Sequence, residues 1–265
     1  MGLLPAHRQI TGIMITPACD VSNFKAETFT YLPVIPVSAY LATVALLPTV
    51  RREVIARYGS AKIDMPINWP DKGYEPPTDE ALVAELARLQ SLSLGNLSPN
   101  DKAHIERAAA GLRIARVCRS SSEPKATVSD YEALFGKQWE VIRKDLVTNA
   151  YRPDIHFLPA DGQKADGFTL VEHSVALFRY PISAPSEILT AAQTVHASGW
   201  QKFMHSYRSI HTAAVHFEEA KPIKVLSLKA SFLPDLLSRF TALYSRIGSP
   251  DFSRETVDRY VGEIA

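Results

Sequence analysis

Residues 8–38 read RQITGIMITPACDVSNFKAETFTYLPVIPVS, and this stretch is the most informative part of the sequence. It holds two apolar runs, residues 10–16 and 28–37, which are rich in β-branched and aromatic residues and are joined by a polar link. Such runs predict two buried strands. Each run ends in proline beside a hydroxyl or thiol side chain, so we expect both strands to deliver polar groups to one end of a β-barrel. Functional residues concentrate where strands meet loops, and we expect the site at this end.

The spacing of apolar residues changes from a strand period to a helix period near residue 40. Three segments place apolar residues at helical intervals, namely residues 78–95, 100–119 and 128–150. The strand pattern returns at residue 155 and includes a long alternating run, residues 167–180. A final amphipathic helix is predicted to begin near Ser231 and to end at Gly248.

These segments predict an α+β fold in which one β-barrel is interrupted by a large helical insertion. The barrel domain comprises residues 1–39 and 151–265 and carries the C-terminal amphipathic helix, and the mostly helical insertion comprises residues 40–150. An insertion of this length between paired strands is acceptable because the entropy cost of loop closure rises slowly with length.

Composition and charge set bounds on function. Of the 265 residues, 46% are hydrophobic, which is enough apolar sequence for a sizeable core. The formal net charge of +1 gives no global field for polyanions, so nucleic-acid binding requires a local patch. No apolar run approaches the roughly 20 residues of a membrane-spanning helix, and we expect no membrane partner. With two cysteines and no secretory signal pattern, we expect a cytoplasmic protein with reduced thiols.

The order of the predicted elements resembles that of the MazF/PemK family, small SH3-like barrels that act as toxins in bacterial toxin–antitoxin pairs. The resemblance rests on Arg8 before the first strand, Asn23 in the next loop, the Pro36-Val37-Ser38 end of the second strand, and a helix opening at Ser231. The turn at residues 19–20 and the segment 243–250 are also similar to an uncharacterised bacterial protein family. The first resemblance implies a MazF-like barrel and a metal-independent endoribonuclease.

In a MazF-like ribonuclease the 2′-hydroxyl of the RNA attacks the adjacent phosphorus, and the protein supplies positive charge and hydrogen-bond donors. The resemblance gives these catalytic roles to Arg8 and Ser38, and it implies single-stranded RNA as partner, with no metal and no cofactor. The expected substrate-binding residues are Thr16, Cys19, Asp20, Asn23 and His173. The competing interpretation leaves Arg8 outside any site and makes Ser38 the N-cap of a helix near Tyr40.

Cys19 and Asp20 allow two interpretations. A Cys19 thiolate beside His173 could act as a nucleophile, because a nearby base or cation lowers the pKa of a thiol. In the interpretation that we favour, Asp20 forms an Asx turn with Ser22 or Asn23 while Cys19 packs as a small hydrophobe.

Two functions from different classes follow. The first is an RNA-engaging endoribonuclease of a toxin–antitoxin or phage-defence system. The second is a non-catalytic protein-interaction module of a bacterial defence or regulatory complex, with a partner docked on the helical insertion or on an open barrel edge. The short segment before Arg8 favours the second function, because an incomplete barrel leaves a strand edge unpaired.

Overall fold

The computed structural model describes residues 11–23, 25–70, 74–93, 96–119, 128–160, 172–207, 217–218, 220–224, 227–228, 232–245, 253–256 and 259. The chain forms two compact units, residues 1–226 and residues 227–265. The first unit combines an antiparallel sheet with several helices, so the fold is α+β. The second unit contains α10 (Leu233–Tyr244), and the predicted helix limits Ser231 and Gly248 lie outside the described residues.

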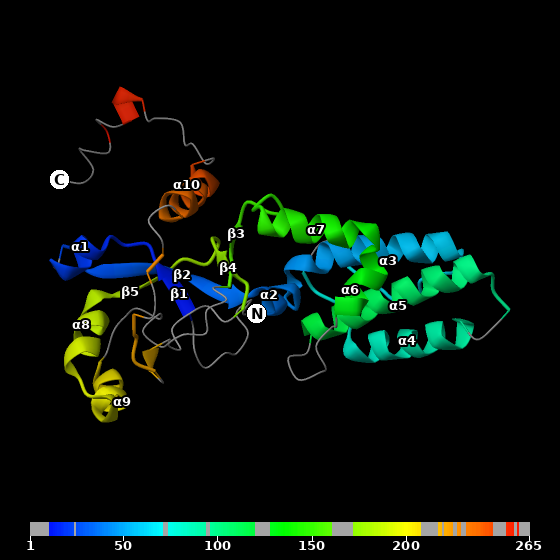
Figure 1. Ribbon diagram of the computed structural model, residues 1–265, viewed down its shortest axis with the longest axis horizontal. Coiled ribbons are helices and arrows are strands. Elements are labelled where there is room, and N and C mark those ends of the chain that lie inside the picture. The colour runs from blue at the N-terminus through cyan, green and yellow to red at the C-terminus, as the bar shows by residue number, and fades with distance from the viewer. Residues whose placement is uncertain are drawn as a thin grey trace. The chain divides into compact units, whose positions relative to one another are not determined.

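Short antiparallel strands make the sheet, as Figure 1 shows. They are β1 (Thr11–Met14), β2 (Thr28–Pro36), β3 (Ile155–Leu158), β4 (Ser174–Leu177) and β5 (Ile182–Pro185). The long strand β2 pairs with β1 on one side and with both β4 and β5 on the other. Strand β3 pairs with β4 and completes the order β1-β2-β4-β3.

A bulge separates β4 from β5. Ile182 faces Tyr31 of β2, and Ala176 faces Val34. Tyr31 and Val34 are three positions apart in β2, but their partners Ile182 and Ala176 are six positions apart. The additional residues fall within 178–181. The alternating pattern predicted one strand through residue 180, but the bulge takes this segment out of the ladder and re-aims its side chains.

The sheet is open, and the predicted closed barrel is not formed. Among the described strands, β1, β3 and β5 each pair with one neighbour, and β1 and β3 are the two ends of the path β1-β2-β4-β3. The N–H of Phe157 in β3 is donated to the side-chain Oδ1 of Asn149 instead of to another strand. An edge covered in this way is not available to β1, and closure would require these two edges to pair.

The chain between β2 and β3 is helical wherever it forms regular structure in the described residues. Its elements are α2 (Val37–Leu41), the 3-10 helix η1 (Val44–Leu46), α3 (Leu47–Ala61), α4 (Asp79–Ser93), α5 (Pro99–Arg119), α6 (Val128–Phe135) and α7 (Lys137–Val147). Helix α5 packs against α3 and α4, which run alongside it in Figure 1, and also against α6. Val54, Leu112 and Leu134 are fully buried in the core that these helices share.

The single helix predicted over residues 128–150 is in fact two helices. Gly136 separates α6 from α7 with a φ of 56°, a backbone conformation that glycine adopts at little cost. Helix α7 buries Trp139, Ile142 and Leu146, whereas its valines Val141 and Val147 are exposed.

Two more helices, α8 (Ser186–Thr194) and α9 (Ala197–Ser206), follow β5. They share a second core with the start of β2, in which Phe29, Tyr31 and Trp200 are buried. Across the described ranges, no helix combines the length and apolar character that a bilayer crossing demands.

Candidate functional site

The expected substrate-binding residues near the first strand hold local structure together. Thr16 accepts the N–H of Thr30 through its hydroxyl at 2.7 Å, which fixes the entry of β2. Residues Ala18–Ser22 form the short helix α1, which is closed by a 2.7 Å bond from the Asn23 side chain to the Cys19 carbonyl. The favoured Asx turn is therefore wrong. Cys19 is exposed rather than packed, and its thiol lies 3.6 Å from Asp20 Oδ1.

Ser38 and His173 lie at the other end of β2. Ser38 is inside α2 and does not cap it, since α2 has no side-chain cap; its hydroxyl donates to Glu172 Oε2 at 3.4 Å. His173 Nδ1 accepts the N–H of Ala160 at 2.9 Å, and its ring lies against Phe157 with centroids 5.4 Å apart. Arg8 lies outside the described residues.

The structure does not bring the predicted site residues near the first strand together with Ser38 and His173. Thr16 is bonded to Thr30 near the start of β2, whereas His173 precedes Ser174, which pairs with Pro36 at the end of β2. Six residues of extended strand separate these two points, a distance of about 20 Å. Cys19 and His173 consequently cannot form a nucleophilic pair in this conformation, and the expected single site divides into two separate groups.

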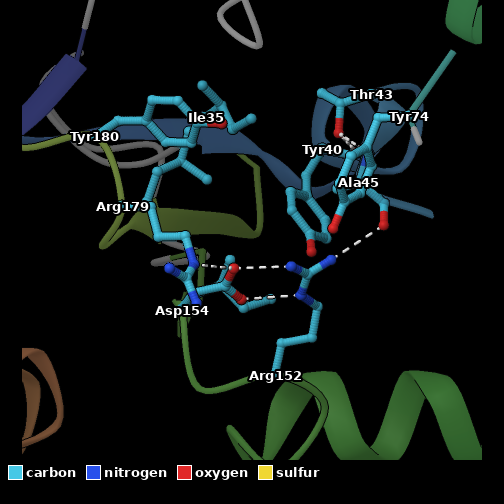
Figure 2. A pocket seen from close by; sticks show the side chains of 11 residues that line it. Ile35, Tyr40, Thr43, Ala45, Tyr74, Arg152, Asp154, Arg179 and Tyr180 are labelled. Carbon is cyan, nitrogen blue, oxygen red and sulfur yellow. Dashed lines mark hydrogen bonds and ion pairs between the residues drawn. The ribbon is translucent and has the colours of Figure 1, made fainter. Parts of the chain in front are cut away.

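A cavity that the sequence did not reveal lies beside the end of β2 (Figure 2). Its volume is about 390 Å³, within the range of small-molecule sites. Ile35, Ile155 and Leu177 supply apolar walls from three neighbouring strands. Its polar and aromatic lining comprises Tyr40, Thr43, Tyr74, Arg152, Asp154, Arg179 and Tyr180.

One carboxylate in this cavity holds two guanidinium groups. Arg152 donates from Nε and Nη2 to the two oxygens of Asp154 at 2.9 and 2.8 Å, and from Nη1 to the carbonyl of Ala45 at 3.0 Å. Arg179 approaches the same carboxylate and donates its Nε–H to Oδ2 at 3.1 Å. Figure 2 shows Asp154 between the two arginines. Arg152 is thus occupied in three directions, whereas Arg179 bonds through Nε alone within the described residues.

The acidity of Asp154 reflects this arrangement. Burial opposes its ionisation, but the hydrogen bonds and charge of Arg152, together with Arg179, outweigh burial and place its pKa below the ordinary value. Asp154 is therefore a carboxylate near neutral pH.

The hydroxyl of Tyr40 points into the cavity toward Arg152 and Asp154 (Figure 2). Tyr40 is 3% exposed, and no described residue lies within hydrogen-bond geometry of its hydroxyl. Burial raises the pKa of Tyr40, although the nearby Arg152 guanidinium acts in the opposite direction through its charge and its closeness to the hydroxyl. Burial also raises the pKa of Tyr180, with the charge of Asp154 adding to the effect. Both phenols are therefore neutral near pH 7 and can donate a hydrogen bond.

The charged cavity residues come from two loops that are joined by backbone. Arg152 and Asp154 lie between α7 and β3, and Arg179 lies in the bulge between β4 and β5. The N–H of Phe178 donates to the Asp154 carbonyl at 3.0 Å, which holds the bulge against the other loop. The available sequence signals were Arg-x-Asp directly before a strand and Arg-Tyr-Pro one residue after another strand. Treating residues 167–180 as one strand concealed the second.

Comparison of the chain with models of protein families, with curated proteins and with solved structures gave no match.

Proposed function

We propose that the chain binds single-stranded RNA and that the cavity around Arg152, Asp154 and Arg179 holds one nucleotide of the strand. The observation that carries the proposal is the combination in one cavity of a partly free guanidinium and several phenol rings. Single-stranded nucleic acids are bound by positive charge along the backbone and by aromatic rings on which bases stack. Arg179 supplies the charge, and Tyr74 and Tyr180 supply rings at the rim.

Arg179 is suited to a phosphate because its side chain is 62% exposed and its two Nη groups are not bonded to described residues. A guanidinium with both Nη groups available can donate two parallel hydrogen bonds to phosphate oxygens. Asp154 holds this guanidinium in place through Nε, so little side-chain order has to be gained on binding.

Binding can be measured by fluorescence anisotropy of a labelled single-stranded RNA in the presence of EDTA. Arg179→Ala is expected to weaken binding at least tenfold, about the loss of one charge-assisted contact of 1.4 kcal/mol or more. The matched control is Arg143→Ala, which removes the same charge from an exposed position on α7 where Arg143 faces Trp139 and does not line the cavity. Equal affinities of the two variants would overturn the assignment of RNA to this cavity.

The proposal extends to RNA cleavage through the resemblance to MazF, here with an open sheet in place of the closed barrel. Ser38 follows Ile35, a cavity residue, by three positions, a span of at most about 11 Å of extended chain. By the resemblance, Ser38 would give up its bond to Glu172 and donate to the phosphate next to the bound nucleotide, and Arg8 would supply the positive charge. Incubation with labelled RNA in EDTA should yield 2′,3′-cyclic phosphate ends, which Ser38→Ala and Arg8→Ala diminish. Binding without cleavage would remove the nuclease from the proposal and leave an RNA-binding module.

A protein-interaction module is the second candidate, and the exposed edge strand β1 supports it. The N–H of Ile15 donates to the Thr30 carbonyl, and hydrogen-bonded residues alternate along an antiparallel ladder. The backbone groups of Gly12 and Met14 therefore point away from β2, in agreement with the position of Pro33, which has no N–H, opposite Gly12. An extended segment of a second protein could add to this edge. Met14→Pro would remove one outward donor at a position whose side chain is exposed, and retention of a co-purified protein by this variant would count against the edge as its docking site.

A further inference from the structure

The charge of the cavity sets the kind of phosphate that it can hold. Two guanidinium groups and one carboxylate leave a single positive charge, from Arg152, Arg179 and Asp154. The other ionisable side chains of the lining, as far as the described residues go, are the phenols Tyr40, Tyr74 and Tyr180. Burial raises the pKa of Tyr40 and Tyr180, so these two hydroxyls act as neutral donors.

The supply of hydrogen-bond donors is similarly limited. Arg152 donates three N–H groups to Asp154 and Ala45, whereas both Nη groups of Arg179 are unbonded within the described residues. Tyr40 adds a buried hydroxyl without a partner there, and it points into the cavity. The two Nη groups of Arg179 can donate parallel hydrogen bonds to the two non-bridging oxygens of a phosphodiester, and the Tyr40 and Tyr180 hydroxyls are further neutral donors in the lining.

A terminal phosphate ester fits less well. It carries close to two negative charges near neutral pH, because its second pKa is about 6. The cavity balances only one of these charges, and its walls include the apolar side chains of Ile35, Ile155 and Leu177. An uncompensated charge against apolar walls loses hydration without gaining a counter-ion, which is costly.

We propose that the cavity selects a singly charged phosphate ester, an internal phosphodiester or a 2′,3′-cyclic phosphate, over a terminal phosphate dianion. This inference rests on the proposed RNA binding and specifies which part of the strand is recognised. The cavity volume of about 390 Å³ lies in the range of small-molecule sites, and the proposal places one nucleoside in it together with the phosphate.

Two mononucleotides of nearly equal size test the inference on the unmodified protein. Uridine 2′,3′-cyclic phosphate carries one charge at all working pH values, whereas uridine 3′-monophosphate changes from one charge to two near pH 6. By calorimetric titration at about pH 7.5, the cyclic ester is expected to bind about tenfold more tightly, and the gap should close at about pH 5 as the 3′-ester gains its proton. Equal or tighter binding of the 3′-ester at the higher pH would overturn the inference.

The outcomes separate this inference from the function on which it rests. If labelled RNA binds in an Arg179-dependent way but the two uridine esters bind equally, or neither binds, RNA binding stands and the charge selectivity fails. If labelled RNA does not bind, the proposed function is wrong, and the inference that rests on it is wrong as well.

A charge variant adds an independent measurement. Asp154→Asn raises the cavity charge to two and should reverse or abolish the preference for the cyclic ester, and an unchanged preference in a folded variant would contradict the charge argument. Because Asp154 also anchors Arg152, folding of this variant is checked by circular dichroism; the comparison on the unmodified protein decides the matter if the variant is unfolded.

Discussion

Removal of the Tyr40 hydroxyl should weaken ligand binding without weakening the fold, and Tyr58 offers a matched control. The two tyrosines are 3% and 2% exposed, so Tyr→Phe makes a similar change in buried volume at each. Their hydroxyls differ in partners. Tyr58 donates to Glu85 Oε1 at 2.6 Å in the helical core, whereas Tyr40 has no described partner.

The magnitudes follow from these partners. Glu85 is itself 3% exposed and keeps its bonds from Arg88 in Tyr58→Phe, but it loses one donor to a buried carboxylate. Such charge-assisted bonds contribute about 1.5–3 kcal/mol, so Tyr58→Phe should lower the free energy of unfolding by that amount. The Tyr40 hydroxyl forms no hydrogen bond within the described residues but lies near the Arg152 guanidinium, so Tyr40→Phe should change the free energy of unfolding by no more than about 1 kcal/mol.

Urea unfolding measures the first effect, and titration with uridine 2′,3′-cyclic phosphate measures the second. We expect the two variants to show opposite patterns, since Tyr40→Phe weakens binding and Tyr58→Phe leaves it unchanged. If Tyr40→Phe lost as much stability as Tyr58→Phe, its hydroxyl would have a structural partner and the reasoning about an unsatisfied donor would be refuted.

Three further predictions concern the fold. The pKa of Asp154 is depressed in the folded state, so its ion pairs stabilise the protein above about pH 4. This contribution is lost as the pH falls through the folded-state pKa. Acid titration of Asp154→Asn should therefore show a shallower loss of stability than that of the unmodified protein. Gly111→Ala places a Cβ against the buried Val54 of α3 and should lower the free energy of unfolding by about 2 kcal/mol. Gly59→Ala has nothing near its Cβ and should raise the free energy of unfolding by about 0.5 kcal/mol. Equal effects in thermal unfolding would contradict the packing argument. Burial raises the pKa of Cys118 to about 12, so iodoacetamide should modify exposed Cys19 first and reach Cys118 only on unfolding, as peptide mass analysis can check.

The spacing of apolar residues in the sequence was sufficient to predict the regular helices and strands, but it did not show where they are interrupted. The segments predicted as helices at 78–95 and 100–119 correspond to α4 and α5, because apolar residues at helical spacing must face a core. Gly136 and the 178–181 bulge were missed because neighbouring residues preserve the apparent period across each break. Pairing of the sheet edges is a long-range property, and local pattern did not show that Asn149 would cover the edge of β3.

The candidate site was missed for a related reason. Its residues come from segments that are distant in sequence, with Tyr40 and Arg179 more than a hundred positions apart, and none of those segments carries a catalytic motif. The residues selected instead, such as Thr16 and Asn23, are polar groups at element ends, and the structure uses both to satisfy backbone. Polar residues at strand ends perform this role often, so their type alone does not separate structural from functional positions.

The position of Asp154 between two arginines connects the fold of the cavity to its proposed use. A carboxylate that only neutralised the arginines would reduce affinity for an anion, yet Asp154 bonds Arg179 through Nε and leaves both Nη groups available. Its backbone carbonyl meanwhile accepts the N–H of Phe178, so the same residue fixes the bulge that carries Arg179. Asp154 therefore lowers the net charge of the cavity while it orients the guanidinium before a ligand arrives. A site built in this way attracts anions less strongly than two unpaired arginines would, but it discriminates between a ligand with one negative charge and a ligand with two.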